Sequence, residues 1–108
     1  GLEEKLEMDY APRKIVLPEK YIKEDVFYVQ KHHLDTNHHV NNCQYVQMAM
    51  DYLPANYKIY QMRAEYKQQA RLNNQIFPGK AEADGVTKIL LNDRNNEPYA
   101  VVEFMEKM

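Results

Sequence analysis

The segment from Asn41 to Leu53 is the one long helical pattern of the chain, and its apolar residues spread over much of the predicted helix surface. Asn41 or Asn42 suits the N-cap position, and Pro54 stops the helix at its other end. One apolar stripe at helical spacing consists of Val46, Ala49 and Leu53. Three further residues widen this apolar surface: Cys43, Tyr45 and Met50. We therefore expect the helix to be covered on most of its circumference.

Sheet-forming patterns surround this helix. One strand is predicted at 23–31, with apolar residues on both of its faces, which indicates burial on both sides or an interface. Four more are predicted at 60–67, 74–84, 86–91 and 99–105, the second of them carrying Pro78 and Gly79, a pair that suggests a bulge or an edge. A strand, a helix and four strands in a meander predict an α+β fold, a curved antiparallel sheet wrapped around one long central helix.

Size and charge narrow the class of protein. A chain of 108 residues is enough for one hydrophobic core, and a net charge of -2 gives no basic face for nucleic acid. The single cysteine, Cys43, has no internal disulfide partner, and no apolar run is long enough to span a membrane. We expect no nucleic acid or membrane partner and a reducing, cytoplasmic setting.

The first twenty residues are expected to form a connector, residues 1–20, ahead of a folded domain at 21–108. Leu2 to Met8 could form a turn or two of helix, and Pro12 and Pro18 bracket an extended basic piece without a clear period. Gly1 could be a remnant of expression engineering. A leading segment of this kind suggests that the chain is the second half of a larger protein.

The side chains best suited to catalysis are concentrated immediately before the predicted helix. Asp35, Asn37 and His39 stand at alternate positions, so a carboxylate, a carboxamide and an imidazole crowd one helix N-terminus. Such side chains can activate water. The N–H groups of the first helical turn, near Asn42 and Cys43, can hold a developing negative charge. This junction is therefore the candidate reaction centre.

The residues of this junction carry a specific resemblance. Together with the order of elements, Asp35-Thr36-Asn37-His38-His39-Val40-Asn41-Asn42 resembles the catalytic, C-terminal hotdog domain of double-hotdog acyl-acyl carrier protein thioesterases. That family has Asp-x-Asn-x-His-Val-Asn-Asn at this place, followed by a helix with an aromatic residue, here Tyr45. The resemblance covers roughly residues 20–106.

A second, weaker match lies in the strand that ends in Met62-Arg63-Ala64-Glu65-Tyr66-Lys67-Gln68-Gln69-Ala70. The family's acidic residue falls on Gln69 here, and the cysteine of the plant members falls on Ala70. A carboxamide cannot act as a general base at neutral pH, although it can orient a water molecule. Either Asp35 supplies the base, or the domain is slow or inactive.

The resemblance implies hydrolysis of fatty acyl-acyl carrier protein thioesters to free fatty acid, without a metal or an organic cofactor. Asp35 would be the base or nucleophile, Asn37 and His39 would position it, and Gln69 would hold the water. The helix N-terminus at Asn41, Asn42 and Cys43 would polarise the thioester carbonyl. The implied partners are the acyl carrier protein and a first hotdog domain, absent from this sequence, which a homodimer would replace in the isolated chain.

Each of these residues also has an ordinary structural interpretation. Asp35 could be a loop acid bonded to nearby N–H groups, Asn37 could favour a left-handed backbone, and His39 could be a satisfied structural histidine. Asn41 and Asn42 suit helix caps better than catalysis. Cys43 is better explained as a small buried filler than as a nucleophile.

Two further interpretations stay open. His32, His33 and His38 invite a metal site, but adjacent histidines point apart in an extended segment, so we expect solvated side chains. The function could instead be that of a single-domain acyl-coenzyme A thioesterase, or of a non-catalytic hotdog that binds acyl chains or forms a dimer.

Overall fold

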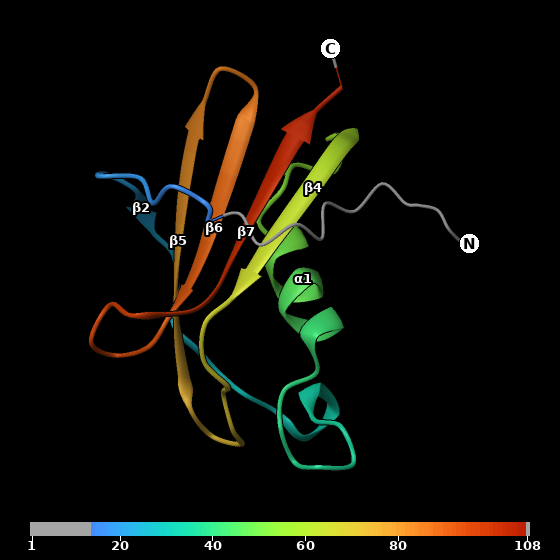
Figure 1. Ribbon diagram of the computed structural model, residues 1–108, viewed down its shortest axis with the longest axis vertical. Helices are drawn as coiled ribbons and strands as arrows, with labels where there is room; N and C mark the ends of the chain where they lie inside the picture. The colour runs from blue at the N-terminus through green and yellow to red at the C-terminus, as the bar shows by residue number, and fades with distance from the viewer. Residues whose placement is uncertain (1–13, 108) are drawn as a thin grey trace.

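The computed structural model describes residues 14–107, so the expected helical turn at 2–8 and Pro12 lie outside the described residues. Within this range an antiparallel sheet packs against an α-helix (Figure 1). The elements in chain order are β2 (Ile22–Lys23), β3 (Phe27–Tyr28), the 3₁₀ turn η1 (Lys31–His33), α1 (Asn42–Met50), β4 (Ile59–Tyr66), β5 (Gln75–Ala83), β6 (Val86–Asn92) and β7 (Pro98–Glu106). The α+β prediction and the order of helix and strands are confirmed.

The sheet has the order β2-β5-β6-β7-β4, with β3 also paired to β5. Only β5, β6 and β7 form a meander, so the prediction of a four-stranded meander was wrong. The strand after the helix, β4, lies beyond β7, with Tyr66 opposite Ala100. This strand order follows from the position of α1, which packs on β6 and β7. The chain that leaves the helix enters the sheet as β4, at the edge beyond β7 (Figure 1).

The predicted strand at 23–31 is replaced by β2, β3 and the turn η1. Lys23 pairs with Gly79 and Phe27 with Ile76, and between these pairs the Glu24 N–H donates to the carbonyl of Pro78 at 2.9 Å. Proline has no N–H to return, so the ladder is interrupted at this point. Burial on both faces within the chain is also wrong, because the side chains of Val26 and Tyr28 are exposed, and the alternative of an interface stays a prediction.

Pro78 and Gly79 mark neither a bulge nor an edge. The register of β5 with β6 runs without a shift through both residues, and β2 covers the other side of β5. Gly79 has a packing role instead, because a Cβ added there would overlap the ring of Tyr21. The glycine therefore allows the segment before β2 to lie close against β5.

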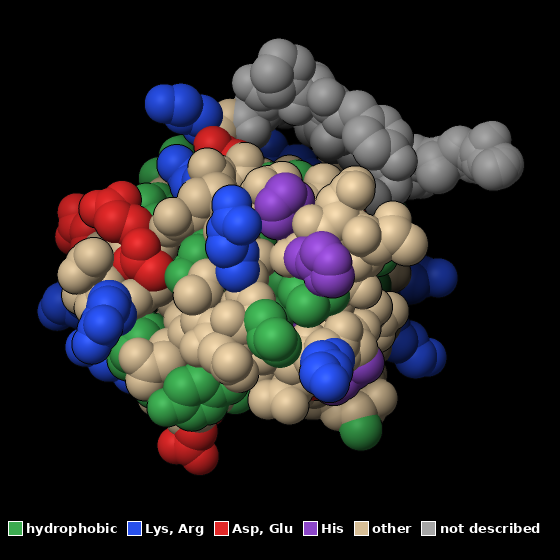
Figure 2. All heavy atoms as spheres, turned by 90° about the horizontal axis from the view of Figure 1, so that it is seen from below, with side chains coloured by type: hydrophobic (Ala, Val, Ile, Leu, Met, Phe, Trp, Pro, Cys, Tyr) green, Lys and Arg blue, Asp and Glu red, His purple; other side chains and the backbone are tan. Residues whose placement is uncertain are grey.

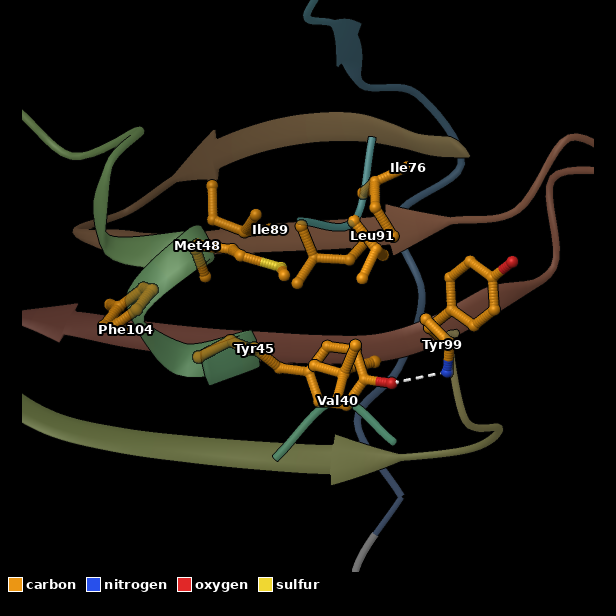
Figure 3. Packing of buried hydrophobic residues seen from close by; sticks show 13 residues of the cluster. Val40, Tyr45, Met48, Ile76, Ile89, Leu91, Tyr99 and Phe104 are labelled. Atoms are coloured by element: carbon orange, nitrogen blue, oxygen red, sulfur yellow. Dashed lines mark hydrogen bonds between the residues drawn. The ribbon is translucent and has the colours of Figure 1, made fainter. Parts of the chain in front are cut away.

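The helix presents one face to the core. Tyr45, Met48 and Ala49 are buried, whereas Cys43 and Met50 are exposed. The predictions of near-complete cover and of a buried Cys43 were wrong, because the sheet lies on one side of α1 only. The helix ends at Met50 rather than Leu53, since the next turn tightens to i→i−3 bonds such as Leu53 N–H to Met50 O. Figure 3 shows the core between α1 and the sheet.

Residues 14–16, in the described part of the expected connector, lie on the face of the sheet opposite to α1. Ile15 is buried, and its N–H donates to Glu65 Oε1 at 2.8 Å. Lys88 Nζ donates to the carbonyl of Val16 at 2.6 Å. Glu65 and Lys88 alternate with core residues along their strands, so they point away from α1. Residues 14–16 are thus fastened across the back of the sheet.

Candidate active site

The loop before α1 closes on itself through Asp35. Its Oδ1 accepts the N–H of Asn37 at 2.8 Å and the N–H of His39 at 3.3 Å. The Asp35 N–H donates to the His39 carbonyl at 2.9 Å, and Leu34 and Val40 form an antiparallel bridge at the base of the loop. One carboxylate oxygen is therefore held by the backbone, while Oδ2 accepts no hydrogen bond from residues 14–107.

The left-handed position of this loop is His38, with φ of 64°, and not Asn37 as the sequence suggested. Backbone in this region is uncommon for residues other than glycine. The turn allows the chain to return toward Asp35 within four residues. Asp35 and His39 are half-buried side by side in the turn, and Asn37 is exposed at its tip.

The helix N-terminus begins at Asn41, whose Oδ1 accepts the N–H of Cys43 at 2.8 Å, so Asn41 is the N-cap. Its own N–H donates to the carbonyl of His33 at 3.3 Å. The N–H groups of Asn41 and Cys43 are thus occupied in this conformation. The first-turn donor that no acceptor of residues 14–107 engages is the N–H of Asn42.

The segment that carries Gln69 is joined to this loop and to the helix. The Val40 N–H donates to the carbonyl of Ala70 at 3.2 Å, and the Ala70 N–H donates to Tyr45 Oη at 2.8 Å (Figure 3). The Tyr45 hydroxyl in turn donates to the carbonyl of Gln68, with 3.5 Å between the two oxygens. Gln69, exposed, stands between the two residues that Tyr45 holds.

The neighbouring Gln68 faces a different part of the molecule. Its Nε2 donates to Asp93 Oδ2 at 3.1 Å in the turn between β6 and β7. Burial acts to raise the pKa of Asp93, but hydrogen bonds from Glu97 N–H, Gln68 and Asn95 N–H outweigh it and lower that pKa below its ordinary value. Gln68 therefore fastens the segment to the sheet end, while Gln69 precedes Ala70, whose carbonyl is bonded to the Val40 N–H beside the Asp35 loop.

Tyr45 is the site residue whose contribution the sequence analysis did not foresee. It is 1% exposed, and burial raises the pKa of its hydroxyl, partly opposed by the bond from Ala70. The signal was present in the family motif, which has an aromatic residue in this helix. The periodicity suggested only a core position, since it contains no information on where the hydroxyl would reach.

His32 and His38 are exposed, as expected for solvated side chains, whereas His33 departs from the expectation. The expectation that adjacent histidines point apart in an extended segment is wrong, because this segment is the turn η1, in which the rings of His32 and His33 lie 4.1 Å apart. His33 is half-buried, its Nδ1 accepts the Gln30 N–H at 2.9 Å, and burial, then the neighbouring His32, lower its pKa. Seen from this end of the molecule, scattered histidine, lysine and arginine side chains lie among neutral ones, with a group of acidic side chains at the left (Figure 2).

No metal cluster marks the Asp35 loop among the described residues. Residues 14–107 contain no group of three or more His, Cys, Asp or Glu side chains placed to hold a metal ion. A hollow of about 450 Å³ lies elsewhere, lined by Lys20, Tyr21, Ile22, Glu24, Lys80, Ala81 and Glu82.

Among the described residues, no helix is both long and apolar enough to cross a bilayer.

A curved antiparallel sheet packed on one helix, with the closed Asp35 loop at the helix N-terminus, is the architecture of a hotdog domain. The family model described as the acyl-ACP thioesterase C-terminal domain matches residues 17–102, and the chain belongs to this family.

The fold is also that of a crystal structure of an acyl-ACP thioesterase from Bacteroides thetaiotaomicron. The match has a TM-score of 0.72 at 14% sequence identity, and it covers 90% of this chain and 44% of that chain. The chain thus spans less than half the length of this solved structure. No curated protein matches the sequence.

Proposed function

We propose that this domain carries the reaction centre for hydrolysis of a fatty acyl thioester of acyl carrier protein, giving the free fatty acid and the carrier thiol. The observation that carries the proposal is the Asp35 carboxylate: two backbone N–H groups hold Oδ1, and no donor of residues 14–107 is bonded to Oδ2. A fixed carboxylate with one available oxygen suits the activation of a water molecule or direct attack. Membership of the thioesterase family supports the reaction class.

Roles for the other residues follow from their placement. His39 and Asn37 hold Asp35 through their backbone N–H groups in the same turn. The Asn42 N–H at the start of α1 is the donor for the thioester carbonyl oxygen, since the helix dipole favours negative charge there. Gln69 holds the attacking water. No step requires a metal or an organic cofactor.

The partner assignments belong to the same proposal. The acyl carrier protein presents the substrate, and a second hotdog domain completes the acyl-binding site, either the first half of a longer protein or a second copy of this chain. Residues 1–20 then serve as the connector ahead of the hotdog domain at 21–108. The exposed outer strand β4, which pairs only with β7 among the described strands, supports a partner at that edge.

The decisive experiment is the Asp35→Asn substitution, assayed for hydrolysis of acyl-acyl carrier proteins over a range of chain lengths. Asparagine retains an oxygen that can accept the N–H groups of Asn37 and His39, so the loop stays closed while the base is lost. We expect kcat to fall by ~10²–10⁴, the range for removal of a general base. Full activity in the folded variant would overturn the role of Asp35. Parallel assays with acyl-coenzyme A identify the carrier.

A second candidate function is a non-catalytic hotdog that binds acyl chains. Two observations favour it: Asp35 Oδ1 already has a structural role, and Gln69 replaces the acid of the family. In that case the folded wild-type chain binds acyl-acyl carrier protein without turnover, alone and with its partner domain. Binding measured by calorimetry beside the hydrolysis assay separates the two functions.

A further inference from the structure

We propose that Tyr45 is a positioning residue that fixes Gln69 beside the Asp35 loop by holding the backbone on both sides of it. The inference rests on the proposed function and extends it to a residue that touches no substrate. Tyr45 Oη accepts the N–H of Ala70 at 2.8 Å and is the donor to the carbonyl of Gln68 at 3.5 Å. The residues bonded to the hydroxyl are therefore those immediately before and after Gln69.

The same segment is tied to the loop by a second bond. The carbonyl of Ala70 accepts the Val40 N–H at 3.2 Å, and Val40 directly follows His39. Ala70 thus bonds to the helix through its N–H and to the loop through its carbonyl. Ala70, Val40 and Tyr45 are all buried, so these bonds are shielded from water. Gln69 and His39 are each one residue away from this shared backbone contact.

A simpler explanation is that the hydroxyl only satisfies a buried tyrosine, as buried tyrosines usually require. The contacts favour a positioning role, because the segment after β4 has left the sheet. From Lys67 to Leu72 the chain has no strand partner among the described residues. The bonds that fix this segment run to Tyr45, Val40, Tyr99 and the β6–β7 turn, and, beyond Ala70, from Arg71 to Asn74. Without the Tyr45 hydroxyl, the N–H of Ala70 loses its partner and the Gln69 backbone gains freedom.

The chain offers a matched control for this hydroxyl. Tyr57 Oη donates to the carbonyl of Phe104 at 3.2 Å, also from a tyrosine that packs against the core. This bond lies at the start of β4, while Gln69 follows the end of β4. Tyr57→Phe therefore removes the same kind of bond from the same core at the end remote from the loop.

The first test measures backbone order by NMR relaxation and amide exchange in Tyr45→Phe and Tyr57→Phe. We expect Tyr45→Phe to lower the order parameter of the Gln69 amide and to speed exchange of the Ala70 amide at least tenfold, with no change at the Val102 amide in the central sheet. We expect Tyr57→Phe to leave the amides of Gln69 and Ala70 unchanged. An unaltered Gln69 and Ala70 in Tyr45→Phe overturns the proposal whether or not the chain is an enzyme.

The second test is a kinetic cycle of Tyr45→Phe with Gln69→Ala on acyl-acyl carrier protein. If Tyr45 acts through Gln69, Tyr45→Phe lowers kcat about tenfold in the wild-type background and has almost no effect once Gln69 is alanine. Equal fold-losses in both backgrounds assign Tyr45 a structural role only and reject the positioning role. An inactive wild type counts against the proposed function, and the order measurements then decide on the positioning of Gln69.

Discussion

Asp35 and His39 are joined twice: the Asp35 N–H donates to the His39 carbonyl at 2.9 Å, and Asp35 Oδ1 accepts the His39 N–H at 3.3 Å. This pairing explains why the histidine of the motif lies four positions after the acid. A shorter loop could not form both bonds, and a longer one would leave the carboxylate without its backbone partners. The structural and the chemical interpretations of Asp35 are therefore compatible, since one oxygen serves each.

The two roles of Asp35 separate in the stability of its variants. Asp35→Ala removes the acceptor for two N–H groups, so we expect the free energy of unfolding to fall by about 1–2 kcal/mol. Asp35→Asn keeps an acceptor oxygen and is expected to lose less than half as much. Denaturant unfolding followed by circular dichroism measures both. Equal losses in the two variants would show that the accepted N–H bonds contribute nothing to stability.

Gln69→Glu restores the acid that the family has at this place. If position 69 faces the attacking water, the carboxylate adds a general base, and we expect kcat to rise by ~10² or more with activity increasing through the titration of the new acid. The control is Gln69→Met, which has similar length without polar atoms and should not raise kcat. A Gln69→Glu variant with unchanged rate and pH profile argues that residue 69 does not reach the reacting groups.

Local patterns predicted the parts of this fold that local rules control. The cap at Asn41, the start of α1 and the strands after Pro54 follow from side chains within a few residues of each other. The position of β4 beyond β7 does not, because strand order depends on where the helix lies on the sheet. The interruption between β2 and β3 likewise depends on Pro78, which is more than fifty residues distant along the chain.

The candidate site divides in the same way. The loop from Asp35 to Asn42 could be found from its sequence, because all of its functional groups are contiguous. The contacts of Tyr45 with Gln68 and Ala70 join residues more than twenty positions apart, and periodicity shows only that Tyr45 faces inward. The exposure of Cys43 was mispredicted for a related reason: an apolar stripe does not indicate how much of the helix one sheet covers.

The cap of α1 gives a prediction independent of catalysis. Asn41→Ala removes the acceptor for the Cys43 N–H, and we expect the free energy of unfolding to fall by about 1 kcal/mol. Asn41→Asp keeps an acceptor and favours the positive end of the helix dipole, so it should be neutral or slightly stabilising. Both are measured by urea unfolding. A stable Asn41→Ala variant would mean that solvent replaces the cap without cost.

The close approach of Tyr21 to Gly79 is testable by adding one methyl group. Gly79→Ala places a Cβ within the space of the Tyr21 ring, and overpacking of this kind costs roughly 1–3 kcal/mol of stability. In a Tyr21→Ala background the methyl group has room, so the same substitution should cost far less. A double-mutant cycle by thermal unfolding gives the coupling. Additive losses would refute the contact.

The final prediction concerns the pH dependence contributed by His33. Burial, and then His32, lower its pKa in the folded state below the ordinary value of 6.5, and its neutral Nδ1 accepts the Gln30 N–H. The unfolded chain therefore binds this proton more readily than the folded chain. The contribution of His33 is fully present above pH 6.5 and is lost progressively as the pH falls from 6.5 through the lower folded pKa.

We expect His33→Asn to flatten this part of the stability profile, because its side-chain oxygen can accept the Gln30 N–H and does not titrate. The measurement is the thermal midpoint of wild type and variant between pH 7.5 and about 5, with NMR titration of the imidazoles. His32→Asn, which removes the neighbouring charge, should raise the pKa of His33 toward its ordinary value. An NMR titration in which wild-type His33 gains its proton above pH 6.5 would contradict both the burial and the hydrogen bond as the controlling interactions.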